Sequence, residues 1–578
     1  MKDLKIALVG GGPSALFMVK KLLDADIDFL SIDIFESADS LGKGMPYSIK
    51  GALESHISNV SSDEIPPLID TLENWIKLQS EQLLSKFELD KSDFHNKEVV
   101  PRLLLGSYLE NQFAKLILIG EKRGYTLNVH LNSEVCDIEV NNVDATYSIL
   151  LQVDKFEGFD KVVICTGHLW PKKEEVKVAG FFNSPYPPQK LNKVFNHSVA
   201  LKGSSLTAID AIRTLSQANG RFIKQGKRLI YQVDNNSEYF KIVMYTLDGL
   251  LPSVRYHLGD PLAFSQYMMS DTQIQHHRAN SGGFVSLDFL FESNFKMLLK
   301  KCDPDFYKTI ADKNVDLFAQ WVLSSRKGFE SFTLLKIEYI QAGQSIRVKN
   351  TIPWKKLFAL LSYSINYPAK YLSGEDMIRL HNILQPLIAI IIADIPQSSA
   401  QQLLALYECG RLDIIPVDKT SQIQILNDHE FHYYLGEDNP TAQAHIFKSF
   451  IDCTGQKPYA IDDFPFTSMF ENRPVAHARV RFKSNENAVF LLSQGTQHIS
   501  LEEDSFYYLN LQGFAINDYF QFLYADGSAT NNCFMMAVPF ISGFNPDYSG
   551  FDFCDQVSTI IVEKIKADRT TILTPREH

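Results

Sequence analysis

The chain has 578 residues, with 56 basic and 68 acidic side chains, a net charge of −12 and 45% hydrophobic residues. At roughly 150 residues per domain, this length predicts about four domains, and the composition excludes a largely disordered protein. An acidic chain without a basic stripe is a poor binder of nucleic acid, and the longest apolar run, residues 386–393, is too short to span a membrane. The odd number of cysteines, seven, argues against a disulfide framework and predicts a cytoplasmic location.

The first 36 residues predict a strand–turn–helix–strand unit. An apolar strand at 5–9 is followed at once by a glycine-rich turn, GGGPSA at 10–15, and then by an amphipathic helix up to residue 23. A second apolar strand at 29–35 ends in Glu36. Because residues 1–9 lack a cleavage-type site, we expect a strand there rather than a signal peptide.

This unit carries the pattern of a dinucleotide-binding turn. Gly10 would make the tight turn, Gly12 would let a pyrophosphate approach the backbone, and the helix N-terminus would attract the phosphates. Glu36 stands 26 residues after Gly10, where its carboxylate would accept from ribose hydroxyls and repel a 2′-phosphate. We therefore expect FAD or NAD here in preference to NADP.

Further along the chain, helices are expected at 65–89 and 105–122, strands within 129–153, and a buried strand at 161–165. A second strand–turn–helix unit starts at His197, and residues 285–405 have mostly helical spacing. Strand patterns return at 412–417, at 449–453 and in the apolar stretch 489–493, which precedes Gly495, Gln497 and His498.

The chain also carries a series of motifs in a characteristic order: GGGPSA at 10–15, LGKGMPYS at 41–48, HISNV at 56–60, PRLLLGSYLENQ at 101–112, VVICTGHLWP at 162–171, GSSLTAIDAI at 203–212, DGLLP at 248–252, CGRLDIIP at 409–416 and FIDCTG at 450–455. Together they resemble the bacterial FAD/NAD(P)-binding flavoproteins with two dinucleotide-binding domains, close to the N-hydroxylating (class B) flavin monooxygenases.

The resemblance implies an α/β fold with two Rossmann-like domains. The FAD-binding domain would be discontinuous, comprising residues 1–190 and 441–578. The NAD(P)-binding-like domain would occupy 191–440 and carry a helical insertion at about 265–405.

The resemblance also implies which residues meet FAD. The pyrophosphate and ribose would be contacted by Gly10, Gly12, Pro13, Ser14 and Glu36. Other cofactor contacts would come from Lys43, Gly44, Met45, Tyr47, Asn59, Arg102, Val135, Thr166, Gly167, Asn545, Pro546 and Asp547. Alternatives stay open: Lys43 and Arg102 as plain surface charges, Met45 and Tyr47 as core packing, and the last helix as packing only on the sheet.

The second glycine turn departs from the pattern, because Ser205 stands where the second glycine would be. The candidates for binding NADPH or NADH are Gly203, Ser204, Ser205, Thr207 and Arg255. The stretch 246–248 carries no cation for a 2′-phosphate, and Arg213 and Arg255 are the nearest basic substitutes.

Three functions remain open at this point. The first is an NAD(P)H- and dioxygen-dependent FAD monooxygenase acting on a small metabolite. The second is an FAD-dependent dehydrogenase or oxidase without oxygen insertion, and the third is a non-catalytic FAD-binding protein with a decayed nicotinamide site. The sequence has no CxxC pair for a redox dithiol and no metal-ligand spacing, so those chemistries are not expected.

Overall fold

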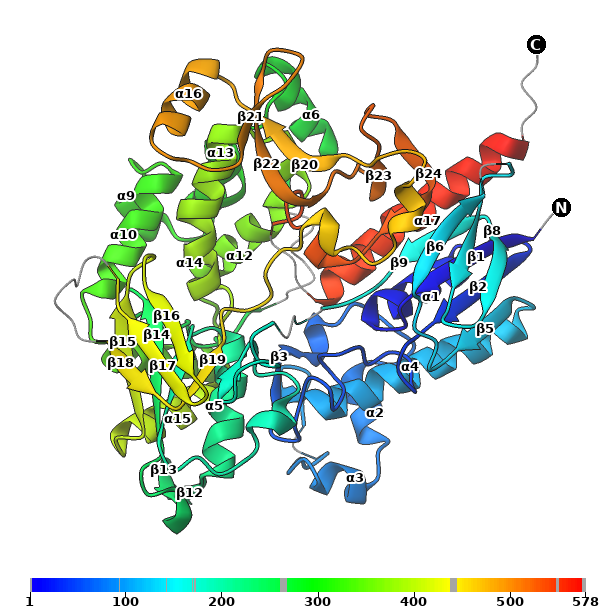
Figure 1. The fold of residues 1–578 in the computed structure, drawn as a ribbon. Coiled ribbons are helices and arrows are strands. Elements are labelled where there is room, and N and C mark those ends of the chain that lie inside the picture. The colour runs from blue at the N-terminus through cyan, green and yellow to red at the C-terminus, as the bar shows by residue number, and fades with distance from the viewer. Residues whose placement is uncertain are drawn as a thin grey trace.

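A computed structural model describes residues 3–92, 94–141, 143–168, 170, 173–259, 268–436, 444–546 and 550–573 (Figure 1). Two mainly parallel sheets form two separate layers, and a largely helical segment lies beside them. The predicted α/β fold is confirmed.

The first sheet has the strand order β23-β24-β9-β1-β2-β5, in which all neighbours except β23 and β24 are parallel. This is the order of a dinucleotide-binding fold. The strands are β1 (Leu4–Val9), β2 (Leu30–Phe35), β5 (Thr126–His130), β9 (Lys161–Ile164), β23 (Gln521–Leu523) and β24 (Ala529–Met535).

Three helices cover one face of this sheet: α1 (Pro13–Asp24), α4 (Arg102–Lys122) and α17 (Phe551–Leu573). Helix α1 contacts both of the others, so the first and last helices of the chain lie side by side. The antiparallel strands β6 (Asp137–Asn141), β7 (Thr146–Leu150) and β8 (Lys155–Phe159) cover the other face.

Shorter elements lie at the edges of this domain. They are β3 (Ile57–Ser61), β4 (Val99–Pro101), α2 (Leu72–Lys77) and α3 (Glu81–Ser85). The single helix expected at 65–89 is therefore wrong: Thr71 and Ser80 each cap the start of a new short helix.

The second sheet has the all-parallel order β10-β19-β11-β14-β15. Its strands are β10 (Phe181–Phe182), β11 (Ser198–Lys202), β14 (Lys241–Leu247), β15 (Leu412–Val417) and β19 (Ser449–Asp452). Two of these strands, β10 and β19, lie outside the expected domain limits of 191–440. This sheet therefore takes strands from segments on both sides of 191–440, because parallel strands are joined by long crossover connections.

Alternate residues of β11 point to opposite faces of this sheet. Val199 and Leu201 belong to a core that includes α5 (Leu206–Ala218), α11 (Ser331–Val348) and α15 (Gln397–Glu408). Ala200 belongs to a core on the other face, under β16 (Gln422–Asn427), β17 (Glu430–Tyr434) and β18 (His445–Phe447). The hairpin β12 (Gly220–Gln225) and β13 (Arg228–Val233) lies beyond α5.

The expected helical insertion is present, and most of its core is continuous with that of the first domain. Its other helices are α6 (Asp271–Asn280), α7 (Leu287–Phe291), α8 (Met297–Cys302), α9 (Pro304–Ile310), α10 (Val315–Lys327), α12 (Pro353–Ile365), α13 (Gly374–Arg379) and α14 (Gln385–Ile391). Two π-helical turns, Glu292–Lys296 and Leu380–Leu384, interrupt them.

A small antiparallel sheet packs beside this segment, with β20 (His477–Arg481), β21 (Ile499–Leu501) and β22 (Tyr507–Phe514). The strand expected at 489–493 is wrong, because these residues lie in α16 (Asn485–Ser493). Ser484 caps this helix by accepting from the Asn487 amide at 3.2 Å, a local signal that overrides the apolar run. Among the residues described, no helix is long and apolar enough to cross a membrane.

Candidate cofactor site

Gly10 makes the turn at the carboxyl end of β1. Its φ of +103° is a conformation that L side chains rarely adopt, and a Cβ there would stand 2.8 Å from the Cys165 carbonyl oxygen. Val9 pairs with Phe35 of β2 and with Ile164 of β9, so these three strands end at the same level. The turn therefore lies between the ends of β1 and β9, as expected for a dinucleotide site.

The N-terminus of α1 is built to accept an anion. Gly12 is its N-cap, no side chain caps it, Pro13 follows, and the first turn carries no acidic residue. The backbone N–H groups of Ser14 and Ala15 therefore remain available as phosphate donors. Gly12 has an ordinary φ of −77°, so its role is to leave space rather than to allow a special backbone conformation.

Glu36 lies where the sequence places it, directly after β2. Its carboxylate accepts from the Gly11 amide at 2.7 Å and from the Ala38 amide at 2.8 Å. These bonds hold the side chain at the strand ends while leaving acceptor capacity for ribose hydroxyls.

The loop at 41–48 packs over the glycine turn. Gly44 lies against Gly12 and Pro13, and Lys43 forms an ion pair with Glu110 of α4 at 2.9 Å. Lys43 is thus tied to α4, and its amine is a partly exposed group of this loop. Met45 is half-buried, and its carbonyl accepts from the Ser48 hydroxyl at 3.1 Å.

Helix α17 begins beside α1, and the residues around its start form the far wall of the site. The rings of Tyr47 and Phe551 stack with centroids 5.7 Å apart, and Ser14 Oγ lies 3.5 Å from Cys554 Sγ. Burial raises the pKa of Tyr47 to about 12, so its phenol stays protonated. The N-termini of α1 and α17, each with partial positive charge, therefore lie close together beside the first glycine turn.

The segment before α17 contains the predicted residues Asn545, Pro546 and Asp547. Asn545 is buried, and within the described chain its Nδ2 has no hydrogen-bond partner. The Pro546 carbonyl accepts from Gln385 of the helical segment at 3.2 Å. Asp547 lies outside the described residues.

The other predicted FAD residues lie in connections or on the short strand β3. Val135 lies between β5 and β6, so it is not on any of the strands that were expected within 129–153. Thr166 and Gly167 follow β9, where the chain leaves the first sheet for β10 of the second. Asn59 of β3 is exposed, and its carbonyl accepts from Arg255 at 2.6 Å.

The second glycine turn repeats the geometry of the first. Gly203 has a φ of +110°, and a Cβ there would stand 2.6 Å from the Cys453 carbonyl oxygen, as Gly10 does beside Cys165. Ser205 is the N-cap of α5 but makes no side-chain capping bond, and the first turn, which includes Thr207, has no acidic residue. Ser204 is tied to the next strand end, because its hydroxyl donates to the Leu250 carbonyl at 2.9 Å.

Arg102 does not lie on the surface. Its guanidinium forms an ion pair at 2.6 Å with Asp210 of α5, and only 14% and 4% of the two side chains are exposed. The Tyr186 hydroxyl donates to the same Asp210 oxygen at 2.6 Å. Arg102 therefore joins the first domain to the second, and sequence reasoning missed this partner.

The two basic residues suggested for a 2′-phosphate are also engaged between the domains. Arg213 donates to the Ser55 carbonyl at 2.8 Å and to the Ser399 hydroxyl at 2.9 Å. Arg255 pairs with Glu64 and with Asp394, the latter at 3.7 Å. Both guanidinium groups are therefore held by protein partners in the domain interface.

A buried histidine completes this interface. His56 Nε2 lies 2.9 Å from Thr214 Oγ1, and the Thr214 hydroxyl donates to the Asp210 carbonyl at 3.0 Å. Thr214 therefore accepts from His56, which fixes the neutral tautomer with its proton on Nε2. Burial, helped by Arg102 and Arg213, lowers the pKa of His56 to about 4.

The missed residues share a pattern that could have found them. Asp210, Arg213 and Thr214 recur at helical spacing on α5, whose other residues are mostly apolar and buried. A polar stripe on a buried helix requires polar partners across an interface. Nothing in the sequence identifies those partners, because Ser55, His56 and Arg102 are more than a hundred residues away.

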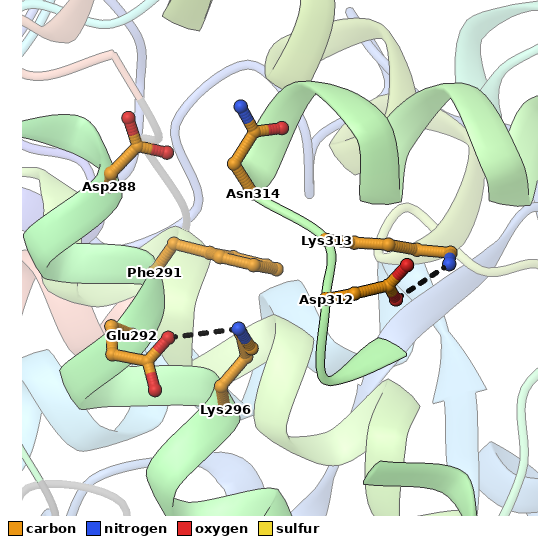
Figure 2. A pocket seen from close by; sticks show the side chains of 7 residues that line it. All are labelled: Asp288, Phe291, Glu292, Lys296, Asp312, Lys313 and Asn314. Atoms are coloured by element: carbon orange, nitrogen blue, oxygen red, sulfur yellow. Dashed lines mark hydrogen bonds and ion pairs between the residues drawn. The ribbon is translucent and has the colours of Figure 1, made fainter. Parts of the chain in front are cut away.

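The helical segment has a hollow of about 210 Å³, and Figure 2 shows the side chains that line it. Its charged lining residues have protein partners: Glu292 pairs with Lys296 at 3.0 Å, and Asp312 pairs with Lys313 at 3.0 Å. It lies at the N-terminal end of α10, and the 13 residues of this helix separate it by roughly 20 Å from the other end, where Arg326 donates to the Leu251 carbonyl after β14. The hollow is therefore separate from the two glycine turns.

Comparisons with known proteins agree with this geometry. A family model described as FAD-NAD(P)-binding matches residues 7–169, and a model described as the YdhS-like middle domain matches 270–392. The protein YdhS of Escherichia coli (strain K12) is 30% identical over 471 residues, which cover 81% of this chain and 86% of that protein. The chain belongs to the YdhS-like family of FAD/NAD(P)-binding proteins.

Two solved structures are similar to this chain over nearly its whole length. The L-lysine 6-monooxygenase of Pseudomonas syringae is 11% identical with a TM-score of 0.50, covering 99% of this chain and all of that one. An ornithine N-hydroxylase from Kutzneria sp. 744 is 10% identical with a TM-score of 0.47, covering 98% of this chain and all of that one. The L-lysine 6-monooxygenase confirms, at the level of the fold, the expected resemblance to N-hydroxylating flavin monooxygenases.

The residues around the first glycine turn fit an FAD. Gly12 leaves the backbone open, α1 offers uncapped donors, Glu36 presents a fixed carboxylate, and the buried Asn545 amide lacks a protein partner in the described chain. A buried amide of this kind is ordinarily satisfied by a ligand or by water.

Replacing Gly12 with Val tests the first glycine turn. The backbone of Gly12 suits a β-branched residue, and a Cβ there would meet Gly44 Cα at 3.4 Å, so the chain should fold. The side chain would occupy the space of the pyrophosphate, and we expect purified Gly12→Val to lose most of its FAD. The ratio of flavin to protein absorbance measures this.

Gly343→Ala is the matched control, because a Cβ at Gly343 in α11 has only Gln397 at 4.0 Å. It should keep full flavin content and gain about 0.5–1 kcal/mol of helix stability. Full flavin occupancy in Gly12→Val would contradict the assignment of this turn.

His56 makes a separate prediction about stability and pH. Its pKa is lowered in the folded state to about 4 from an ordinary value of about 6.5, so the unfolded chain binds the proton more readily between these values. Burial of neutral His56 therefore makes the free energy of unfolding depend on pH. The contribution of His56 is complete above about pH 6.5 and falls by about 3 kcal/mol as the pH drops to 4.

Denaturation of wild type and His56→Gln at pH 7 and pH 4.5 measures this difference, because other groups titrate equally in both proteins. We expect the variant to lose less stability on acidification than wild type. Replacement of the exposed His477 by Gln is the control for loss of a histidine at the surface. Parallel pH curves for wild type and His56→Gln would show that His56 is not buried as described.

Proposed function

We propose that the chain is an FAD-dependent oxidoreductase that oxidises NADPH or NADH and uses dioxygen to hydroxylate a small molecule. One nucleotide, one proton, one dioxygen and one substrate would give NAD(P)⁺, water and the hydroxylated product. When bound, FAD supplies the transfer of electrons from the nucleotide to dioxygen.

The observation that carries this proposal is the duplicated glycine turn. Gly10 and Gly203 make the same close approach to the chain after a neighbouring strand, and each precedes a helix whose N-terminus has no side-chain cap. The first glycine turn fits FAD, and the second glycine turn offers the same features to a second dinucleotide. Two dinucleotides held at fixed edges are what hydride transfer between them requires.

The cysteines support oxygen chemistry over disulfide reduction. All seven are free, and Cys136, Cys302 and Cys409, the exposed ones, lie on separate elements. Burial raises the pKa of Cys165, near the first turn, and raises that of Cys554 to about 12. Buried thiols of raised pKa are poor nucleophiles, so neither is suited to thiol–disulfide exchange.

The contacts around the first site also limit access of water. Tyr47 and Phe551 stack at the junction of the loop, α4 and α17, and Asn545 lies buried before α17. A dry site with a few polar groups is what an oxygen-using flavin needs to avoid unproductive loss of its electrons.

The proposal predicts that NADPH or NADH bleaches the bound flavin in the absence of air. Readmission of dioxygen with a panel of small amines and acids should then give a hydroxylated product that carries one atom of isotope-labelled dioxygen. Absorbance follows the flavin, and mass spectrometry detects the product.

Two other outcomes would contradict the proposal in different ways. Reoxidation with stoichiometric hydrogen peroxide across the whole panel would indicate an oxidase without oxygen insertion. Failure of both nucleotides to bleach the flavin would indicate an FAD-binding protein whose second edge no longer delivers electrons.

A further inference from the structure

The end of β14 holds the residue that corresponds to Glu36. Strand β14 neighbours β11 as β2 neighbours β1, and Asp248 directly follows β14 as Glu36 follows β2. An acid at this place in a dinucleotide-binding fold accepts from the ribose 2′-hydroxyl of NAD, whereas a cation accommodates the 2′-phosphate of NADP. In a dinucleotide-binding fold, the residue at this position therefore bears on the choice between NAD and NADP.

The helical segment docks on this strand end. Arg326, near the C-terminus of α10, donates to the Leu251 carbonyl at 3.0 Å and pairs with the buried Glu338 at 2.8 Å. The Ser331 hydroxyl, at the start of α11, donates to the Gly249 carbonyl at 2.6 Å. The corner between α10 and α11 is therefore fixed against residues 249–251.

This corner brings a cation to Asp248. Lys327, the last residue of α10, forms an ion pair with the Asp248 carboxylate at 2.8 Å. The two side chains are 44% and 52% exposed, so a ligand at the strand end can reach both. An exposed ion pair of this kind contributes little to stability, so a phosphate can replace the carboxylate as the partner of the lysine.

The position of Lys327 contrasts with those of the arginines. Arg213 is buried, Arg255 is only 12% exposed, and both are held by partners between the domains, whereas Lys327 is half-exposed beside the ribose position. The cation that 246–248 lacks in sequence is thus supplied from a residue about eighty positions later in the chain.

We propose that Lys327 and Asp248 together determine which nicotinamide nucleotide the second glycine turn accepts. Asp248 accepts from the ribose diol of NADH, and Lys327 offsets the charge of Asp248 and binds the 2′-phosphate of NADPH. This inference rests on the proposed function, because that function places a nicotinamide nucleotide at the second turn. It makes the helical segment part of the nucleotide site.

Calorimetry on FAD-loaded protein measures how Lys327 and Asp248 affect nucleotide binding, without any turnover. Bound FAD occupies the first glycine turn, so the added probes bind at the second. The probes are adenosine 2′,5′-bisphosphate and adenosine 5′-diphosphate, which represent the NADPH and NADH ribose ends. Lys327→Met should weaken the bisphosphate by about tenfold or more, as expected for loss of one charge-assisted hydrogen bond, and leave the diphosphate within about twofold.

Asp248→Asn should act in the opposite sense, binding the bisphosphate more tightly and the diphosphate more weakly. Lys313→Met is the matched control, because Lys313 lies just before the N-terminus of α10 and pairs with Asp312. It should leave both affinities unchanged.

The inference is overturned if Lys327→Met weakens both probes equally or neither, or if wild-type protein binds neither. Anaerobic flavin reduction by NADH and NADPH, measured in parallel, separates this failure from failure of the proposed function. Bleaching of wild type with an unchanged nucleotide preference in Lys327→Met refutes the inference alone. The expected probe affinities without bleaching by either nucleotide support the inference and refute the function.

Discussion

The buried ion pair between Arg102 and Asp210 fixes how the two dinucleotide-binding domains meet. In a buried pair, much of the Coulomb attraction is offset by the cost of removing both charges from water, so the pair contributes little net stability. Its effect is on geometry. Any rotation that keeps the interface dry but separates the partners leaves a buried charge without compensation, at a cost of about 3–5 kcal/mol. The Tyr186 hydroxyl on the same carboxylate and the contact between His56 and Thr214 restrict the arrangement further.

The fixed interface gives the two glycine turns a constant relation, and the rest of the chain maintains it. Helix α17 returns from the end of the chain to lie beside α1, and α10 brings Lys327 to Asp248 at the end of β14. The middle domain of this family thus connects the other two domains. Its core is continuous with that of the first domain, and the junction of α10 and α11 contacts the second. A dinucleotide at either glycine turn would contact residues from distant parts of the sequence.

The sequence was sufficient for the parts of the site that are local. Gly10, Gly12 and Glu36 lie on one strand–turn–helix–strand unit, and their spacing alone predicts their positions. The same holds for Gly203 and the start of α5. Contacts between residues far apart in the sequence could not be predicted: Arg102 was expected to contact FAD and Arg255 was a candidate for the second nucleotide, and the sequence did not indicate their partners in the interface, Asp210 and Glu64. The helix at 485–493 was missed because a short apolar run does not distinguish strand from helix.

The distance between the two domains in solution tests this account most directly. Spin labels at Leu118 of α4 and Tyr239 of the second domain, both exposed, report on it once the exposed Cys136, Cys302 and Cys409 are replaced by Ser. Pulsed dipolar spectroscopy should give one narrow distance that is the same for oxidised protein, reduced protein and protein with bound NADP⁺. A second distance whose population changes with reduction or nucleotide would show that the domains rotate, and would contradict the fixed interface.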